Sequence, residues 1–153
     1  MQKVKIEPFM VIGISVRTDN NDGRAAKDIG GLWNKFMQEG IQSKIPNKLT
    51  EEVLSVYTNY EGDHLKPYDV ILGCKVKSLN QIPEGMVGHS FDGGTYASHV
   101  SKGDLTKDAI VNSWLEIWES GLDRTYTADF EVYGEKAIDP TNGEADILIA
   151  IKD

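Results

Sequence analysis

The sequence predicts an α+β fold made of two consecutive strand–helix–strand–strand halves. Apolar residues recur at every second position in several segments, which is typical of strands. Two amphipathic helical stretches, GLWNKFMQEG and SWLEIWESG, lie about 80 residues apart, and each is followed by two strand patterns. We therefore expect one domain, residues 1–153, with half-repeats at approximately 1–80 and 81–153. Pseudo-twofold symmetry would give antiparallel sheets with helices on one side and a central ligand groove.

In the first half, residues 4–16 alternate in hydropathy and predict a long strand. Pro8 indicates an edge position or a bulge, because proline cannot donate a ladder hydrogen bond. Apolar residues at helical spacing between Ile29 and Met37 predict a helix that ends near Gly40.

Gly30 and Gly31 lie inside this helix, where each glycine costs up to ~1 kcal/mol relative to alanine. We expect close packing against the sheet as the reason for them. The strand patterns at residues 53–60 and 68–76 are near enough in sequence to pair as a hairpin.

The second half repeats this order. Residues 86–100 read as extended, with a break at residues 92–94. A broad apolar stripe between residues 110 and 122 predicts a helix, and the patterns at 127–133 and 145–152 predict two strands.

The composition limits the classes of partner. Sixteen basic against 24 acidic residues give a formal net charge of −8, which disfavours nucleic acid and anionic membranes as partners. An acidic surface suits a cationic ligand, although solubility alone also explains it. No signal peptide or apolar run of ~18 residues is present, so we expect a cytoplasmic location and no membrane partner.

The sequence contains no motif for a metal, a cofactor or an activated serine. The single cysteine, Cys74, cannot form an intramolecular disulfide or a cysteine-based metal site, and we expect an inert core thiol. His64, His89 and His99 share no ligand spacing, and no Gly-x-Ser-x-Gly elbow occurs. We expect neither a metal nor a cofactor.

The segment ADFEVYGE holds the candidate binding carboxylate. Strand alternation places Phe130 and Val132 on one face, which we expect to pack on the helices, and Glu131 and Tyr133 on the opposite face, in the groove. A carboxylate beside aromatic rings can hold a lipophilic cation, and burial would raise its pKa when the site is empty. The alternative is that Glu131 is a solvated residue on an open sheet face.

Seven segments, in order, resemble the GyrI-like, or AraC-type effector-binding, domain, and in particular its integron-associated branch. They are VIGISVRT, LWNKF, Tyr60-Glu61, YDVILGCKV, GGTYASHVSKG, VNSWLEIWESG and ADFEVYGEKA. The resemblance runs from about Val4 to Lys152. It implies a central pocket that, in multidrug-responsive members, binds lipophilic cations through a buried glutamate among aromatic rings.

The residue that matches the family's carboxylate is Glu131. The resemblance also transfers pocket-lining positions to five aromatic residues: Tyr68, Trp114, Tyr96, Trp33 and Tyr133. From helical spacing alone, the three tryptophans Trp33, Trp114 and Trp118 are more typical of a core than of a binding site.

Many relatives carry a helix-turn-helix module before this domain, whereas this chain begins almost at its first strand. We therefore expect a free-standing effector-binding domain with no direct contact to DNA, acting as a sensor of the transcription-regulator type or sequestering its ligand. The expected ligand is a small aromatic or cationic molecule, and a protein partner or a homodimer stays open.

Two alternatives remain. Glu131 would activate a water, with a tyrosine assisting proton transfer, in a hydrolase of cyclopropane-containing electrophilic toxins. Alternatively, the domain would be a protein-interaction module such as a gyrase inhibitor. Of the three hypotheses, we expect the effector-binding domain, which is not an enzyme.

Overall fold

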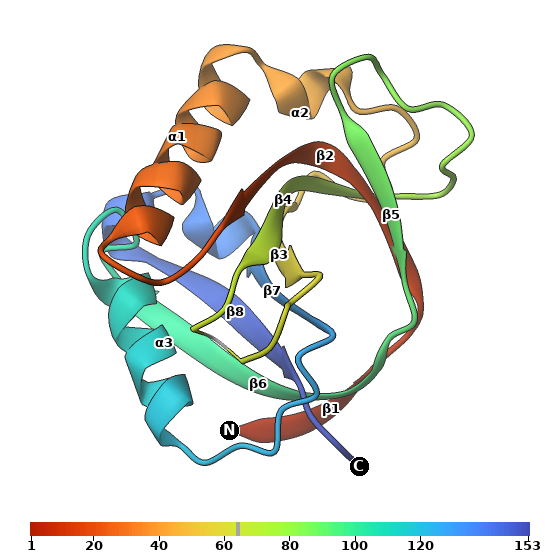
Figure 1. The fold of residues 1–153 in the computed structure, drawn as a ribbon. Helices are drawn as coiled ribbons and strands as arrows, with labels where there is room; N and C mark the ends of the chain where they lie inside the picture. Colours follow the sequence, from red (N-terminus) through yellow and green to blue (C-terminus); the bar gives the residue numbers. More distant parts are fainter. Residues whose placement is uncertain (64) are drawn as a thin grey trace.

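The computed structural model describes residues 1–63 and 65–153, so the prediction for His64 lies outside the described residues. The described strands form one antiparallel sheet in the order β1-β6-β8-β7-β3-β4-β2-β5 (Figure 1). The elements, in chain order, are β1 (Gln2–Ile6), β2 (Phe9–Thr18), α1 (Arg24–Gln38), α2 (Ile41–Lys44), β3 (Val53–Thr58), β4 (Tyr68–Val76), β5 (Val87–Phe91), β6 (Gly94–Gly103), α3 (Ala109–Glu119), β7 (Ala128–Tyr133), the 3-10 turns η1 (Glu135–Ala137) and η2 (Pro140–Asn142), and β8 (Gly143–Ala150).

The sheet curls until its two edges meet. β1 runs directly into β2 through Pro8, and β5 runs into β6 through Gly93, although each pair lies at opposite ends of the strand order. The β1–β6 ladder continues into the β2–β5 ladder without a shift in register, with Ile6 opposite Gly94 and Phe9 opposite Phe91. Gly93 has a φ of 75°, and a Cβ there would lie 2.2 Å from the carbonyl oxygen of Ile6, so the crossing requires glycine.

The strand order confirms the predicted fold class. Exchanging each strand for its counterpart in the other half (β1 with β5, β2 with β6, β3 with β7 and β4 with β8) and reading the order backwards returns the same order. The boundaries of the elements differ from the sequence prediction in two details. The first strand breaks at Pro8 into β1 and β2, and the polar connection after α1 contains the short helix α2. The division into halves near residue 80 stays a prediction.

Both faces of the curled sheet are buried. The face inside the curl carries one apolar cluster, which includes Val11, Val56, Tyr96 and Phe130. The other face packs beneath α1 and α3, which lie on the same side of the sheet (Figure 1).

The predicted facing of β7 was therefore wrong. Its residues alternate as expected, but Phe130 points into the curl, whereas Glu131 points to the helices and contacts Trp114 of α3. The ligand groove accordingly lies on the helix side of the sheet. The predicted facing applies to an antiparallel sheet with a core on one face only, whereas the curl gives this sheet a core on its second face as well.

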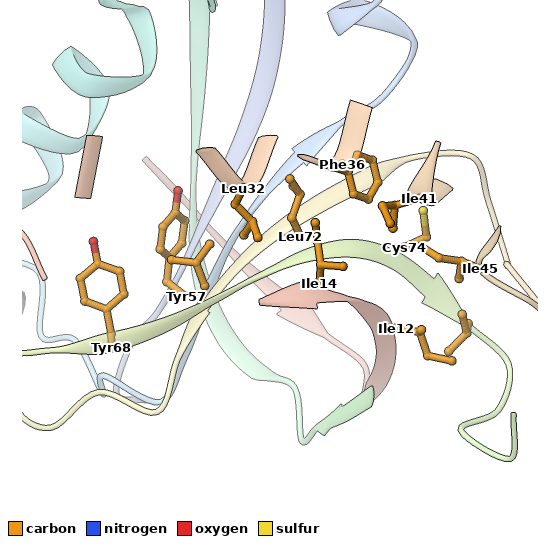
Figure 2. Packing of buried hydrophobic residues seen from close by; sticks show 12 residues of the cluster. Ile12, Ile14, Leu32, Phe36, Ile41, Ile45, Tyr57, Tyr68, Leu72 and Cys74 are labelled. Atoms are coloured by element: carbon orange, nitrogen blue, oxygen red, sulfur yellow. The ribbon is translucent and has the colours of Figure 1, made fainter. Parts of the chain in front are cut away.

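The cluster beneath α1 ends at two tyrosines. Its aliphatic part joins Leu32 and Phe36 of α1 to Leu72 of β4. Figure 2 shows Tyr57 and Tyr68 at one end of this cluster, with their hydroxyl groups directed away from the sheet. Cys74 lies within the same cluster, and burial raises the pKa of its thiol to about 11, as expected for an inert core thiol.

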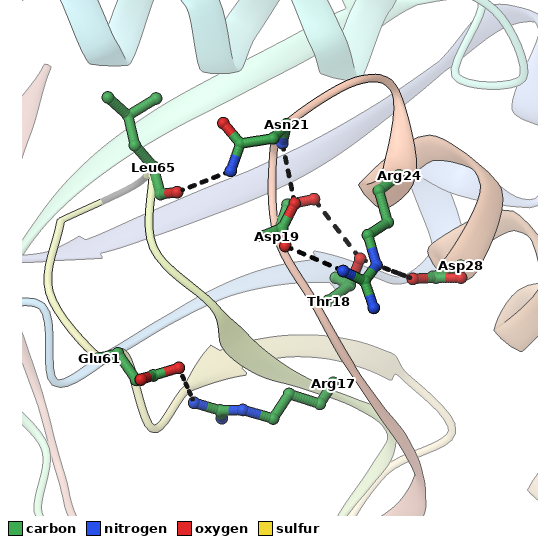
Figure 3. A network of polar contacts seen from close by, with 8 residues as sticks. All are labelled: Arg17, Thr18, Asp19, Asn21, Arg24, Asp28, Glu61 and Leu65. Carbon is green, nitrogen blue, oxygen red and sulfur yellow. Dashed lines mark hydrogen bonds and ion pairs between the residues drawn. The ribbon is translucent and has the colours of Figure 1, made fainter.

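Polar contacts fix the loop that leads into α1 (Figure 3). Arg24 pairs with Asp19 at 3.3 Å, and the Thr18 hydroxyl donates to Asp28 at 2.8 Å. The Asn21 amide donates to the carbonyl of Leu65 at 3.1 Å, which ties the loop to the start of the β4 hairpin. This loop therefore holds the N-terminal end of α1 in place.

The two glycines inside α1 do not pack closely against the sheet, contrary to the expectation. Gly30 and Gly31 are both exposed, and a Cβ built on either meets nothing within 4 Å among the described residues. Instead, Gly30 lines the cavity described below. No helix in the described part of the chain is both long enough and apolar enough to span a membrane.

Candidate functional site

A cavity of about 1820 Å³ opens on the helix side of the sheet. Its walls come from α1, α3, β3 and β7 and from the turns that follow β7. All three tryptophans of the chain line it: Trp33, Trp114 and Trp118. Glu131 also lines it, yet its side chain is almost completely withdrawn from water, with 1% relative exposure.

Three neutral donors hold the Glu131 carboxylate. The Tyr57 hydroxyl and the Trp114 indole N–H both donate to Oε2 at 2.7 Å. The Tyr133 hydroxyl donates to Oε1 at 2.5 Å. Hydrogen bonds to a charged acceptor are stronger than neutral ones, so the three donors orient the carboxylate.

Burial still dominates the electrostatics of this group. Loss of hydration raises the pKa of Glu131, and the hydrogen bonds from Tyr133, Trp114 and Tyr57 oppose that rise only in part. Burial and the charge of Glu131 raise the pKa values of Tyr57 and Tyr133 well above the ordinary value. The two hydroxyls therefore remain protonated and act as donors.

The cage around Glu131 follows the symmetry of the fold. Glu131 lies directly opposite Ser55 in the β3–β7 ladder, at the centre of the strand order. On one side of this pair the ring of Trp33 meets Tyr133 edge-on at 5.0 Å, and on the other Trp114 meets Tyr57 at 5.4 Å. Each half thus contributes one tryptophan and one tyrosine, but only the second half contributes a carboxylate.

A second buried carboxylate lies two residues earlier on the same face of β7. Asp129 is fully buried and accepts from Arg124 Nη2 at 2.7 Å, from the Tyr60 hydroxyl at 2.6 Å and from the Ala150 amide at 2.8 Å. Burial raises the pKa of Asp129, and the charge of Arg124 opposes that rise. Asp129 therefore has its own cation, whereas the groups that hydrogen-bond Glu131 are neutral.

The structure brings together five of the six residues selected from the sequence. Around Glu131 it gathers Trp33, Trp114, Tyr133 and Tyr68, all of which line the cavity. The Tyr68 hydroxyl donates to Asn20 at 2.6 Å, which joins the cavity wall to the loop before α1.

Tyr96 is the exception. It does not line the cavity but packs on Phe130 at 5.5 Å inside the curl of the sheet. Tyr96 and Glu131 therefore lie on opposite faces of the sheet.

Sequence reasoning did not select Tyr57, Tyr60, Asp129 and Arg124. Tyr57 could be found only from the pairing of β3 with β7, which joins strands about 75 residues apart. Asp129 could be predicted from the sequence, because strand alternation places it on the same face as Glu131.

The described histidines lie apart from the cavity wall. His99 lies 3.7 Å from Glu116, and His89 stacks on Phe91 with ring centroids 4.4 Å apart. Within residues 1–63 and 65–153, no group of three or more His, Cys, Asp or Glu side chains is arranged to hold a metal ion.

Comparison with known proteins gives consistent matches over the whole chain. An integron cassette protein from the mobile metagenome of Vibrio cholerae has 30% identity and a TM-score of 0.77, with 99% of this chain and 95% of that chain covered. The structure of SAV2435 bound to tetraphenylphosphonium has 16% identity and a TM-score of 0.81, with 99% and 93% covered. YobU of Bacillus subtilis (strain 168), which carries the provisional name of a transcriptional regulator protein, is 24% identical over 144 residues, with 92% of this chain and 90% of that protein covered.

The family model described as integron-associated effector binding protein matches residues 4–151. This match confirms the resemblance stated from the sequence. The chain belongs to the family of integron-associated effector binding proteins.

Proposed function

We propose that the cavity binds a lipophilic, aromatic cation and that Glu131 neutralises its charge. The observation that carries this proposal is a carboxylate with 1% exposure in the wall of a large cavity, held by three neutral donors. No Lys, Arg or His among the described residues lies within ion-pair distance of it. A cation in the cavity would supply the missing counter-charge.

Coulomb attraction favours such a ligand over a neutral one. Two unit charges 4 Å apart attract by about 4 kcal/mol at an effective dielectric constant of ~20. The faces of Trp and Tyr rings add about 0.5–2 kcal/mol for a desolvated cation. The rings Trp33, Trp114 and Tyr68 can provide these faces and can also bury the apolar body of the ligand.

The charge and polarity of the cavity support the same ligand class. Among the described residues, six carboxylates and three basic side chains line it: Glu51, Glu52, Glu131, Glu135, Glu144, Asp146, Lys107, Arg124 and Lys136. Met37, Val111 and Ile138 line it as well and expose 57–82% of their surface, so an apolar molecule meets favourable surface on entry. Tetraphenylphosphonium, the ligand named for the similar SAV2435 structure, is a lipophilic aromatic cation.

The test uses two ligands of nearly the same shape but different charge, methyltriphenylphosphonium and triphenylphosphine oxide, measured by isothermal titration calorimetry. The wild-type chain is expected to prefer the phosphonium, and Glu131→Gln to weaken the phosphonium by about tenfold or more while leaving the oxide unchanged. Glu119→Gln, which removes the same charge from an exposed position on α3, is the control. Equal losses for the two ligands in Glu131→Gln would reject the electrostatic role.

A further inference from the structure

The guanidinium of Arg124 is a second charged group in the wall of the cavity. Its side chain is only 5% exposed, and the rings of Tyr126, Trp114 and Tyr60 surround it with centroids 4.3, 5.9 and 6.0 Å from its central carbon. Its Nη2 donates to Asp129 Oδ2 at 2.7 Å. Arg124 is thus held in place by an ion pair and by contacts with three aromatic rings.

Two of its three nitrogens have no hydrogen-bond partner in the part of the chain that the structure describes. Nε and Nη1 are buried, and neither meets an acceptor among the described residues. A guanidinium carries five N–H donors, and buried donors of a charged group are costly to leave unpaired. Asp129 accepts from neither of them, because its Oδ2 bonds Arg124 Nη2 and Tyr60 and its Oδ1 bonds the Ala150 amide. Arg124 lines the cavity, and a ligand that displaces part of the surrounding rings would bring an oxygen acceptor to these buried nitrogens.

Arg124 and Glu131 are close enough to bind one molecule. The Trp114 indole N–H donates to Glu131, and the same indole ring lies 5.9 Å from the Arg124 guanidinium carbon. Asp129, the partner of Arg124, and Glu131 are two residues apart on one face of β7, which is about 7 Å along a strand. The two charged groups therefore lie along one wall, with Trp114 in contact with both.

We propose that Arg124 forms an acceptor-binding subsite and that the preferred ligand is an aromatic cation that also carries a carboxylate or a similar oxygen acceptor. The cation pairs with Glu131, and the acceptor receives hydrogen bonds from Arg124. This inference rests on the proposed function and narrows the ligand class to molecules that carry both a cation and an oxygen acceptor. Without the Arg124 subsite, a carboxylate on the ligand would be repelled by the acidic lining of the cavity.

Rhodamine B and rhodamine B ethyl ester test this subsite, because esterification removes only the free carboxylate. Fluorescence anisotropy of each dye with the full chain gives the two dissociation constants. The wild-type chain is expected to bind rhodamine B at least as tightly as the ester. In Arg124→Lys, one ammonium keeps the charge beside Asp129 but lacks the planar set of donors, and the ratio of affinities should shift toward the ester by about tenfold or more.

Glu131→Gln separates the two proposals. It should weaken both dyes, since both carry the cation. If Glu131→Gln weakens both dyes but Arg124→Lys leaves the affinity ratio unchanged, the acceptor subsite is refuted and the proposed function stands. If neither dye binds, or Glu131→Gln changes neither affinity, both proposals fail.

Circular dichroism and thermal unfolding establish that the Arg124→Lys chain is folded. If it does not fold, the affinities of the two dyes for the wild-type chain decide whether the subsite exists. A preference for the ester by about tenfold or more overturns the subsite, and tighter binding of rhodamine B supports it.

Discussion

Ser55 and Glu131 lie directly opposite each other in the ladder that joins the two halves of the sheet. The position that holds a carboxylate in the second half thus holds a small hydroxyl in the first. Around this pair, Trp33 with Tyr133 and Trp114 with Tyr57 form two similar edge-on contacts. Aromatic rings thus flank the pair on both sides, and Glu131 places a carboxylate between them.

The stability of the empty protein should depend on the charge of Glu131. Burial raises its folded-state pKa above the ordinary value of 4.5, so the folded protein binds this proton more tightly than the unfolded chain does. Its contribution to the free energy of unfolding is greatest below pH 4.5 and is lost as pH rises through the folded-state pKa. Urea unfolding at several pH values should show Glu131→Gln becoming more stable relative to wild type over this range, and a constant difference would contradict it.

Cation binding should show the linked pH dependence. Only the ionised carboxylate pairs with a cation, so the affinity for methyltriphenylphosphonium should rise as pH rises through the folded-state pKa of Glu131 and then level off. The affinity for triphenylphosphine oxide should not follow this curve. Calorimetric titrations of both ligands at several pH values provide the measurement, and parallel curves would argue against Glu131 as the group that titrates.

The indole N–H of Trp114 should help to keep Glu131 ionised. Trp114→Phe removes a donor at 2.7 Å but keeps an aromatic ring, so the pKa of Glu131 should rise further and the pH midpoint of phosphonium binding should move up. Trp118→Phe, one turn along α3, keeps all three donors to Glu131 and is the control. The role assigned to the N–H fails if both variants shift the midpoint equally.

Two tyrosines distinguish the cavity from the interior of the curl. Tyr57→Phe removes a hydrogen bond to the carboxylate and should weaken phosphonium binding by about tenfold. Tyr96→Phe alters a side chain on the other face of the sheet and should leave the affinity unchanged. A larger loss in Tyr96→Phe than in Tyr57→Phe would show that the ligand lies inside the curl.

Glycine substitutions should change stability in opposite directions. A Cβ at Gly73 would lie 2.1 Å from the carbonyl oxygen of Ile12, so Gly73→Ala should lower the free energy of unfolding by several kcal/mol, on the order of 3 or more. Gly31→Ala meets nothing within 4 Å in an exposed helix interior and should raise it by about 1 kcal/mol. Urea denaturation measures both, and a neutral Gly73→Ala would contradict the close approach of β2 and β4.

The sequence could predict the parts of the fold that depend on local pattern. Strand alternation and helical spacing located the main elements, and alternation correctly separated Phe130 from Glu131. Which of these two residues faces the helices depends on the curl of the sheet. The edges close through pairing of β1 with β6 and β2 with β5, which joins residues about 75–95 apart and leaves no local signal.

The candidate site shows the same division. The resemblance selected Glu131 together with Trp33, Trp114 and three tyrosines. Composition and spacing alone could not separate Tyr96 from Tyr57, since both are strand tyrosines next to apolar residues. Only the register places Tyr57 beside Glu131 and Tyr96 inside the curl.

A crystal structure of the chain with tetraphenylarsonium tests the central claim most directly, because the anomalous signal of arsenic locates the cation without reference to the protein. We predict an arsenic peak inside the cavity, beside the Glu131 carboxylate and among the rings of Trp33 and Trp114. An arsenic peak at the outer carboxylates Glu51 and Glu52, or outside the cavity altogether, would contradict the account.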